Sequence, residues 1–178
     1  MLEKMNMVIG AFFSEVGTRL LSYFSPFDPE LEKIRKELIV TNEWSYKEFL
    51  EVANRLKKYD YPADARKGDL ADLKKFLTSK MDFMLRLLEN PNLLEHDSFT
   101  QLLWSVFHLA EELANRQNLT GLPNSDLAHL SGDIKRVYSR LVCEWLDYMR
   151  HLKRNYPYLF SLAIRTNPFN PAASVIVT

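Results

Sequence analysis

The chain has 178 residues, of which 47% are hydrophobic and 26% charged, as in ordinary globular proteins. Lysine plus arginine and aspartate plus glutamate both number 23, so the formal net charge is zero. No overall field would attract nucleic acid, and we expect no nucleic-acid partner. The single cysteine, Cys143, excludes an internal disulfide. No run of about 20 apolar residues predicts a complete transmembrane helix.

The first segment, Met5–Phe24, predicts an amphipathic helix with a broad apolar face and a thin polar one. Two interpretations remain open: a helix of the core, or a helix that contacts a membrane or a partner. The polar face has few lysines or arginines to meet anionic lipid, which argues against simple binding at a membrane surface. In the second interpretation the contact residues are Phe12, Phe13, Leu20, Leu21 and Phe24.

The next two helices are predicted from residues that cap helix ends. Asp28 precedes a proline and a glutamate, which favours a helix start there, and the pattern continues to about Val40. Ser45 and Glu48 have the spacing of a capping box, which predicts a third helix to about Tyr59.

Residues 60–68 have the composition of a loop within one domain. Asp69 predicts the start of a helix that continues to about residue 89. Asp97 or Ser98 is predicted to cap the next helix, which extends to about Arg116.

The longest helical pattern is Ser125–Arg165, in which apolar residues recur at three- and four-residue steps. Pro157 removes a backbone donor and predicts a kink near that point. We therefore predict an all-α fold: an irregular bundle of five to six helices around this long helix. Residues 1–171 would form a single domain and residues 172–178 an extended tail.

The segment after the predicted kink is apolar nearly all round. It either packs against the core or provides a second contact surface. In the latter case the contact residues are Tyr158, Phe160 and Phe169.

A metal site is the main alternative, because helical bundles hold di-iron sites built from Glu-x-x-His pairs. The spacings found here are different: His108-x-x-Glu111, Asp126-x-x-His129, His129-x-x-x-Asp133 and Asp147-x-x-x-His151. Such pairs also stabilise ordinary surface helices. The candidate ligands of this alternative are His108, Glu111, Glu112 and His129.

No phosphate-binding glycine loop, Gly-x-Ser-x-Gly elbow or Cys-x-x-Cys pair is present. Cys143 lies beside Glu144 in the middle of a helix, where the negative charge disfavours a reactive thiolate. We therefore expect no catalytic residue and no cofactor, and these absences favour a non-enzymatic protein over an enzyme.

Three groups of strings resemble a known family: VIGAFFSEVGTRLLSYFS near the start, LLENPNLLEHDSFTQLLWSVFHLAEEL in the middle, and EWLDYM with NYPYLFSLAIRTNPFNP near the end. Together they resemble the helical soluble portion of uncharacterised archaeal and bacterial membrane proteins. Some of these proteins carry an ion-channel-like pair of membrane helices. The resemblance implies that residues 7–13 match the cytosolic end of the last membrane helix. The Thr-Val-Gly-Tyr-Gly filter of channels is absent from this chain, so the resemblance does not imply conduction.

These observations predict an interaction or regulatory domain at or beside a membrane protein, in the cytoplasm or at the inner face of the cell membrane. A membrane, a membrane-protein surface and a second copy of the chain are the expected partners. The alternative is a helical-bundle metal-binding protein or metalloenzyme that uses the histidine and glutamate ligands named above.

Overall fold

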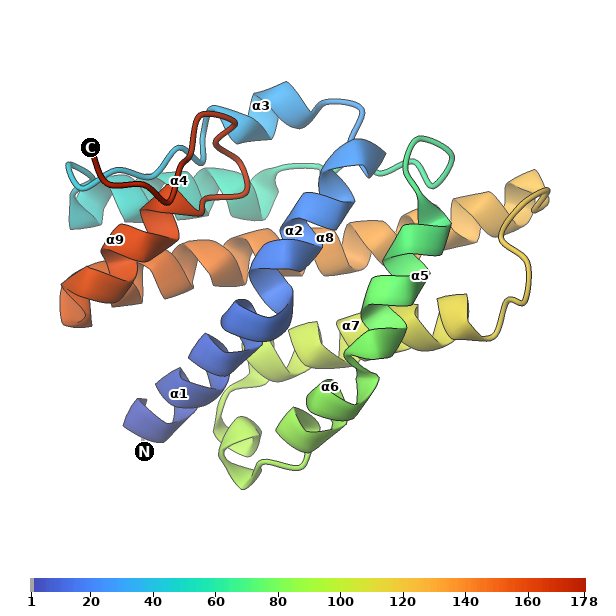
Figure 1. Ribbon diagram of the computed structural model, residues 1–178, viewed down its shortest axis with the longest axis horizontal. Helices are drawn as coiled ribbons and strands as arrows, with labels where there is room; N and C mark the ends of the chain where they lie inside the picture. Colours follow the sequence, from blue (N-terminus) through green and yellow to red (C-terminus); the bar gives the residue numbers. More distant parts are fainter. Residues whose placement is uncertain (1) are drawn as a thin grey trace.

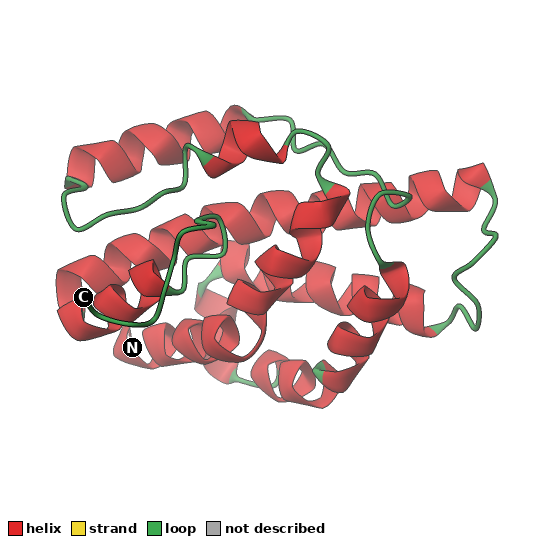
Figure 2. Ribbon diagram, turned by 45° about the horizontal axis from the view of Figure 1, so that its top comes forward, coloured by secondary structure: helices red, strands yellow, loops and turns green. Residues whose placement is uncertain are grey.

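The computed structural model describes residues 2–178, except for the side chains of residues 2–6 and of Leu94, so the predicted place of Met5 on the apolar face lies outside the description. Within this range the chain is helical, without strands, which confirms the all-α prediction (Figure 2). The α-helices are α1 Leu2–Phe12, α2 Thr18–Phe24, α3 Leu31–Arg35, α4 Tyr46–Lys58, α5 Leu70–Ser79, α6 Met81–Leu88, α7 Asp97–Ala114, α8 Asn124–Asn155 and α9 Pro157–Arg165. Shorter turns are η1 Phe13–Gly17, η2 Ser25–Phe27 and η3 Pro91–Glu95.

Helix α8 is the longest element, with 32 residues, and it crosses the whole molecule (Figure 1). Helices α7, α4 and α2 pack along it, and its buried stripe includes Tyr138, Leu141 and Trp145. The chain breaks at Tyr156, where φ is −139° and ψ is 71°, and α9 begins at Pro157. The predicted central helix and its kink are therefore confirmed.

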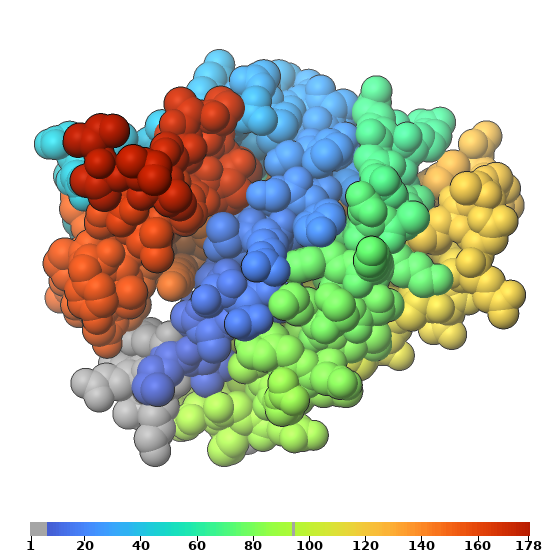
Figure 3. Space-filling model, in the orientation of Figure 1, coloured from blue at the N-terminus to red at the C-terminus, as the bar shows by residue number. Residues whose placement is uncertain are grey.

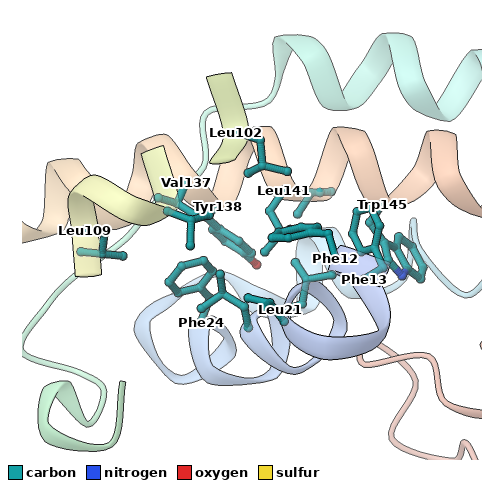
Figure 4. Packing of buried hydrophobic residues seen from close by; sticks show 14 of the residues in the cluster. Phe12, Phe13, Leu21, Phe24, Leu102, Leu109, Val137, Tyr138, Leu141 and Trp145 are labelled. Atoms are coloured by element: carbon teal, nitrogen blue, oxygen red, sulfur yellow. The ribbon is translucent and has the colours of Figure 1, made fainter. Parts of the chain in front are cut away.

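The first helix is continuous but contains a π-helical turn, η1, between α1 and α2. Its aromatic side chains point at α8, as the close view of the core shows (Figure 4). The ring of Phe12 packs edge-on against Phe99 of α7 at 5.4 Å between centroids, and Phe24 against Tyr138 at 5.8 Å. The predicted N-terminal contact residues are at most 2% exposed: Phe12, Phe13, Leu20, Leu21 and Phe24. These side chains therefore belong to the core and form no contact face.

The C-terminal segment also packs inward. Phe169 lies edge-on to Trp145 at 5.3 Å, and the amide of Asn167 donates to the carbonyl of Leu38 over 2.8 Å. Phe160 and Phe169 are 2% and 1% exposed, which corrects the prediction that they form a contact surface. Tyr158 lies on the opposite side of α9 and is 71% exposed.

Of the four predicted helix caps, two are confirmed and two are wrong. His96 rather than Asp97 or Ser98 caps α7, because its Nδ1 atom accepts a 3.2 Å hydrogen bond from the N–H of Phe99. Ser45 and Glu48 form the capping box of α4, and the side chain of Asp69 caps α5. Asp28 is instead buried, because its carboxylate accepts a 2.8 Å hydrogen bond from the hydroxyl of Tyr138 on α8. Helix α3 begins later, at Leu31, and covers only five residues rather than continuing to position 40.

The predicted helix over residues 69–89 is two helices, α5 and α6. Lys80 separates them with φ −105° and ψ 0°. Both helices pack against α7. The break changes the direction of the chain, so that the apolar residues of α5 and those of α6 both face α7. Such interruptions account for the larger number of helical segments among residues 2–178 than the five to six predicted.

Among the described residues, no helix combines the length and the apolar character that crossing a bilayer would need.

The π turn depends on Gly17. A Cβ atom there would lie 2.5 Å from Cδ1 of Phe13 and 2.9 Å from Cε1 of Phe12, both rings being buried. We expect Gly17→Ala to lower the free energy of unfolding by about 1–3 kcal/mol, because overpacking displaces the rings. Gly132→Ala on α8 is the matched control. No atom lies within 4 Å of its added Cβ, so we expect it to stabilise by about 0.5–1 kcal/mol. Urea unfolding followed by circular dichroism measures both, and equal effects would contradict the packing argument.

Candidate metal centre

Helices α7 and α8 run antiparallel and side by side (Figure 1). Each carries a histidine followed four residues later by an acid: His108 and Glu112 on α7, and His129 and Asp133 on α8. Residues four apart lie on the same face of a helix, one turn from each other. The antiparallel packing brings the two pairs together into one cluster of four side chains, here called the four-residue site.

Four distances define the site. The Nε2 atom of His108 lies 3.6 Å from Oε1 of Glu112 and 3.6 Å from Oδ2 of Asp133. The Nε2 atom of His129 lies 3.4 Å and 3.3 Å from the same two oxygens. Bonds from zinc to nitrogen and oxygen are about 2.0–2.2 Å, so neighbouring ligand atoms in a tetrahedral site are about 3.3–3.6 Å apart. The ligand atoms of His108, Glu112 and Asp133 all lie within 4.8 Å of one another, close enough to hold one ion, and His129 lies beside the same two carboxylates.

Two arginines orient the carboxylates. Nη1 of Arg116 donates to Oε2 of Glu112 over 2.7 Å, and Nη1 of Arg136 donates to Oδ1 of Asp133 over 2.7 Å. In each carboxylate one oxygen is therefore held by an arginine, and the other faces the histidines. Metal sites commonly have such outer hydrogen bonds, which fix the direction of the ligand oxygen.

The inner oxygen of Asp133 is the most unusual atom of the site. The residue is 3% exposed, and its Oδ2 atom is buried without a hydrogen-bond partner among the described residues. An unpaired buried carboxylate oxygen is costly and therefore rare in native proteins. A cation coordinated between the two histidines would satisfy this oxygen.

The Arg116 guanidinium also holds Asp126 at the start of α8, through bonds of 2.6 and 2.8 Å. Its hydrogen bonds keep the pKa values of the Glu112 and Asp126 carboxyls below their usual range. Glu112 is consequently ionised at neutral pH. Ionised carboxylates and neutral imidazoles are the forms that bind a metal.

Of the ligands predicted from the sequence, His108, Glu112 and His129 lie in the site. Glu111 is exposed and lies outside it, because one residue along a helix rotates the side chain by about 100°. Asp133 was absent from the predicted ligand set. The His129-x-x-x-Asp133 spacing could have indicated Asp133 as a ligand. It does so only in combination with the same spacing of His108 and Glu112 on α7, the helix packed against α8.

Nearly the whole chain is similar to known proteins. The model of a family described as the C-terminal helical domain of the uncharacterised protein MJ1433 matches residues 1–165. The chain belongs to this family. The uncharacterised protein MJ1433 of Methanocaldococcus jannaschii is 49% identical over 175 residues, which cover 98% of this chain and 70% of that protein. No solved structure matches the chain. The family is thus a helical domain of an uncharacterised archaeal protein, and its description names no activity, membrane or channel.

Arg116→Met tests the electrostatic support of the site. We expect it to destabilise the protein by about 1–3 kcal/mol at pH 7, because two charge-assisted contacts are lost. The folded-state pKa values of Glu112 and Asp126 lie below their unfolded-state values, so this contribution is present at neutral pH. It disappears as pH falls below about 4 through the folded-state pKa values.

Unfolding of both proteins across this pH range provides the measurement. Arg66→Met is the control, because the exposed pair of Arg66 with Asp64 contributes little to stability. A loss of stability at pH 3 as large as at pH 7 would show that Arg116 acts through packing instead.

Proposed function

We propose that this domain binds one divalent first-row transition-metal ion, of the zinc type, at the four-residue site. The observation that carries the proposal is the buried, unpaired Oδ2 atom of Asp133, which faces the Nε2 atoms of both His108 and His129. Glu112 supplies the second carboxylate oxygen.

The ligand set favours this class of metal. Two imidazole nitrogens with two carboxylate oxygens suit zinc, iron, cobalt, nickel or copper, whereas calcium and magnesium prefer oxygen ligands alone. The site lies between consecutive helices, so an ion bound there would link α7 to α8. Ligands that bind only the folded state stabilise it by about 2.7 kcal/mol at a concentration of 100 times Kd. The metal would in this way fix the pairing of the two helices.

Zinc binding is measurable by titration calorimetry and by thermal unfolding with and without chelator. We expect a stoichiometry of one and a higher Tm with zinc. Asp133→Asn should abolish the zinc-dependent rise in Tm. In chelator, the same variant should be at least as stable as wild type, because Asn keeps the Arg136 contact and removes a buried charge.

The matched control is Asp147→Asn, which also removes an acid four residues from a histidine of α8. Asp147 pairs with Arg150 and lies outside the four-residue site, so zinc binding should be unchanged. Equal zinc affinity of wild type and Asp133→Asn would refute the four-residue site. A lower chelator-treated stability of Asp133→Asn would show that its charge has a structural role.

A second candidate is an interaction domain beside a membrane protein, in the cytoplasm or at the inner face of the cell membrane. Its support is the sequence resemblance together with the outer side of α9, where Tyr158, Leu159 and Leu162 are 71%, 39% and 47% exposed. A recess separates α9 from the N-terminal helix in the space-filling view (Figure 3). The cavity there is about 390 Å³ and is lined by Leu159 and Leu162 of α9 and by Tyr148 of α8.

Vesicle flotation tests this candidate. The full chain should rise with vesicles of neutral and anionic phospholipid, and the double variant Tyr158→Ser and Leu162→Ser should remain at the bottom. The control is Leu50→Ser with Leu85→Ser, which removes comparably exposed apolar side chains from α4 and α6. If the wild-type chain stays at the bottom, membrane contact is rejected, and a partner protein or a second copy becomes the surface to test.

A further inference from the structure

We infer that the metal held by the four-residue site takes an oxyanion of the phosphate type as an additional ligand, with Arg136 as its second point of attachment. This inference rests on the proposed metal binding. The oxyanion would bind the ion at coordination positions that the protein side chains do not fill.

One side of the site faces solvent. The side chains of His108 and His129 are each 50% exposed, whereas those of Glu112 and Asp133 are 24% and 4% exposed. The carboxylates therefore lie below the ion and the imidazoles lie at the surface. Four protein ligands fill a tetrahedral shell, so a further ligand requires the ion to expand to five or six ligands, which opens one or two positions. Those positions point toward the solvent-exposed side of the site, where water or a small anion can bind.

The charge around the open side favours an anion. Two carboxylates neutralise a dication, and Arg116 is already occupied by Glu112 and by both oxygens of Asp126. Arg136 is different, because its side chain is 49% exposed and the structure gives it one hydrogen bond, from Nη1 to Oδ1 of Asp133. The structure gives the rest of its guanidinium no side-chain partner among the residues it describes, and Arg136 lies one helical turn after Asp133 on α8. A planar guanidinium and a metal together match the oxygens of a phosphate group.

An exposed aromatic ring lies on the same row of α7. Trp104 is 57% exposed and stands four residues, one turn, before His108. Exposed tryptophan rings stack on bases and other flat rings. The oxyanion therefore has two possible sources, free phosphate or the phosphate of an aromatic ester such as a nucleotide, and Trp104 distinguishes them.

The experiment uses the full chain loaded with Co²⁺, whose visible absorption reports the number and type of its ligands. Addition of inorganic phosphate should change this absorption saturably. Arg136→Gln removes the arginine that orients Asp133 and should weaken Co²⁺ binding by up to about 10–100-fold, so it is compared with wild type at saturating Co²⁺. Under that condition it should weaken phosphate at least about tenfold, the loss of one hydrogen bond to a charged group. Arg136→Lys should recover part of the affinity. Arg150→Gln, farther along α8, is the matched control and should bind phosphate as wild type does.

A second titration uses adenosine monophosphate. Tighter binding than inorganic phosphate, lost in Trp104→Ala, would identify an aromatic phosphate, and equal binding would identify the free oxyanion. The inference is overturned if Co²⁺ binds but excess phosphate leaves its absorption unchanged, or if Arg136→Gln binds phosphate like wild type. Failure to bind Co²⁺ at all would instead refute the proposed function, so the two failures differ in their readout.

Discussion

The fold depends on the burial of one face of α8 along its length. This helix is too long to be covered by one neighbour, so α7, α4 and the N-terminal helix each cover a part of it. Aromatic rings fill the space between them, with Phe24 of α2 edge-on to Tyr138 of α8. Aromatic pairs of this kind contribute geometry as well as buried area. Gly17 in the π turn leaves room for the rings of Phe12 and Phe13, which are buried in this packing.

The same packing creates the site. Helices α7 and α8 pair to bury leucine and valine side chains such as Leu109 and Val137, and the pairing fixes where the adjacent polar rows meet. His108 and Glu112 flank Leu109 on α7, and Asp133 is drawn into the seam beside Ile134. The hydrophobic contacts therefore hold a carboxylate where water does not reach it. Such a position is unfavourable for a charge without partners. Arg136 pairs with one oxygen of Asp133, and the proposed cation would pair with the other.

Much of the architecture could be predicted from spacing and caps alone. The Ser45 capping box, the Asp69 cap and the break before Pro157 depend on interactions within a few residues, and each lies where the sequence predicted. The failures involve distant partners. Asp28, with Pro29 and Glu30 after it, has the residue types of a helix cap. Its carboxylate is instead held in the interior by the hydroxyl of Tyr138, 110 residues away. A cap signal carries no information about such a partner.

The sequence by itself determined the helical class, the central helix and three members of the four-residue site, because helical periodicity and the chemistry of histidine and glutamate are local properties. Only the tertiary structure decided that Phe12, Phe24 and Phe169 are core residues, since an apolar stripe looks the same whether it faces α8 or a partner. It also decided that Asp133 completes the site. A four-residue step places two side chains on one face of a helix, but only the packing of α7 against α8 makes two such faces meet.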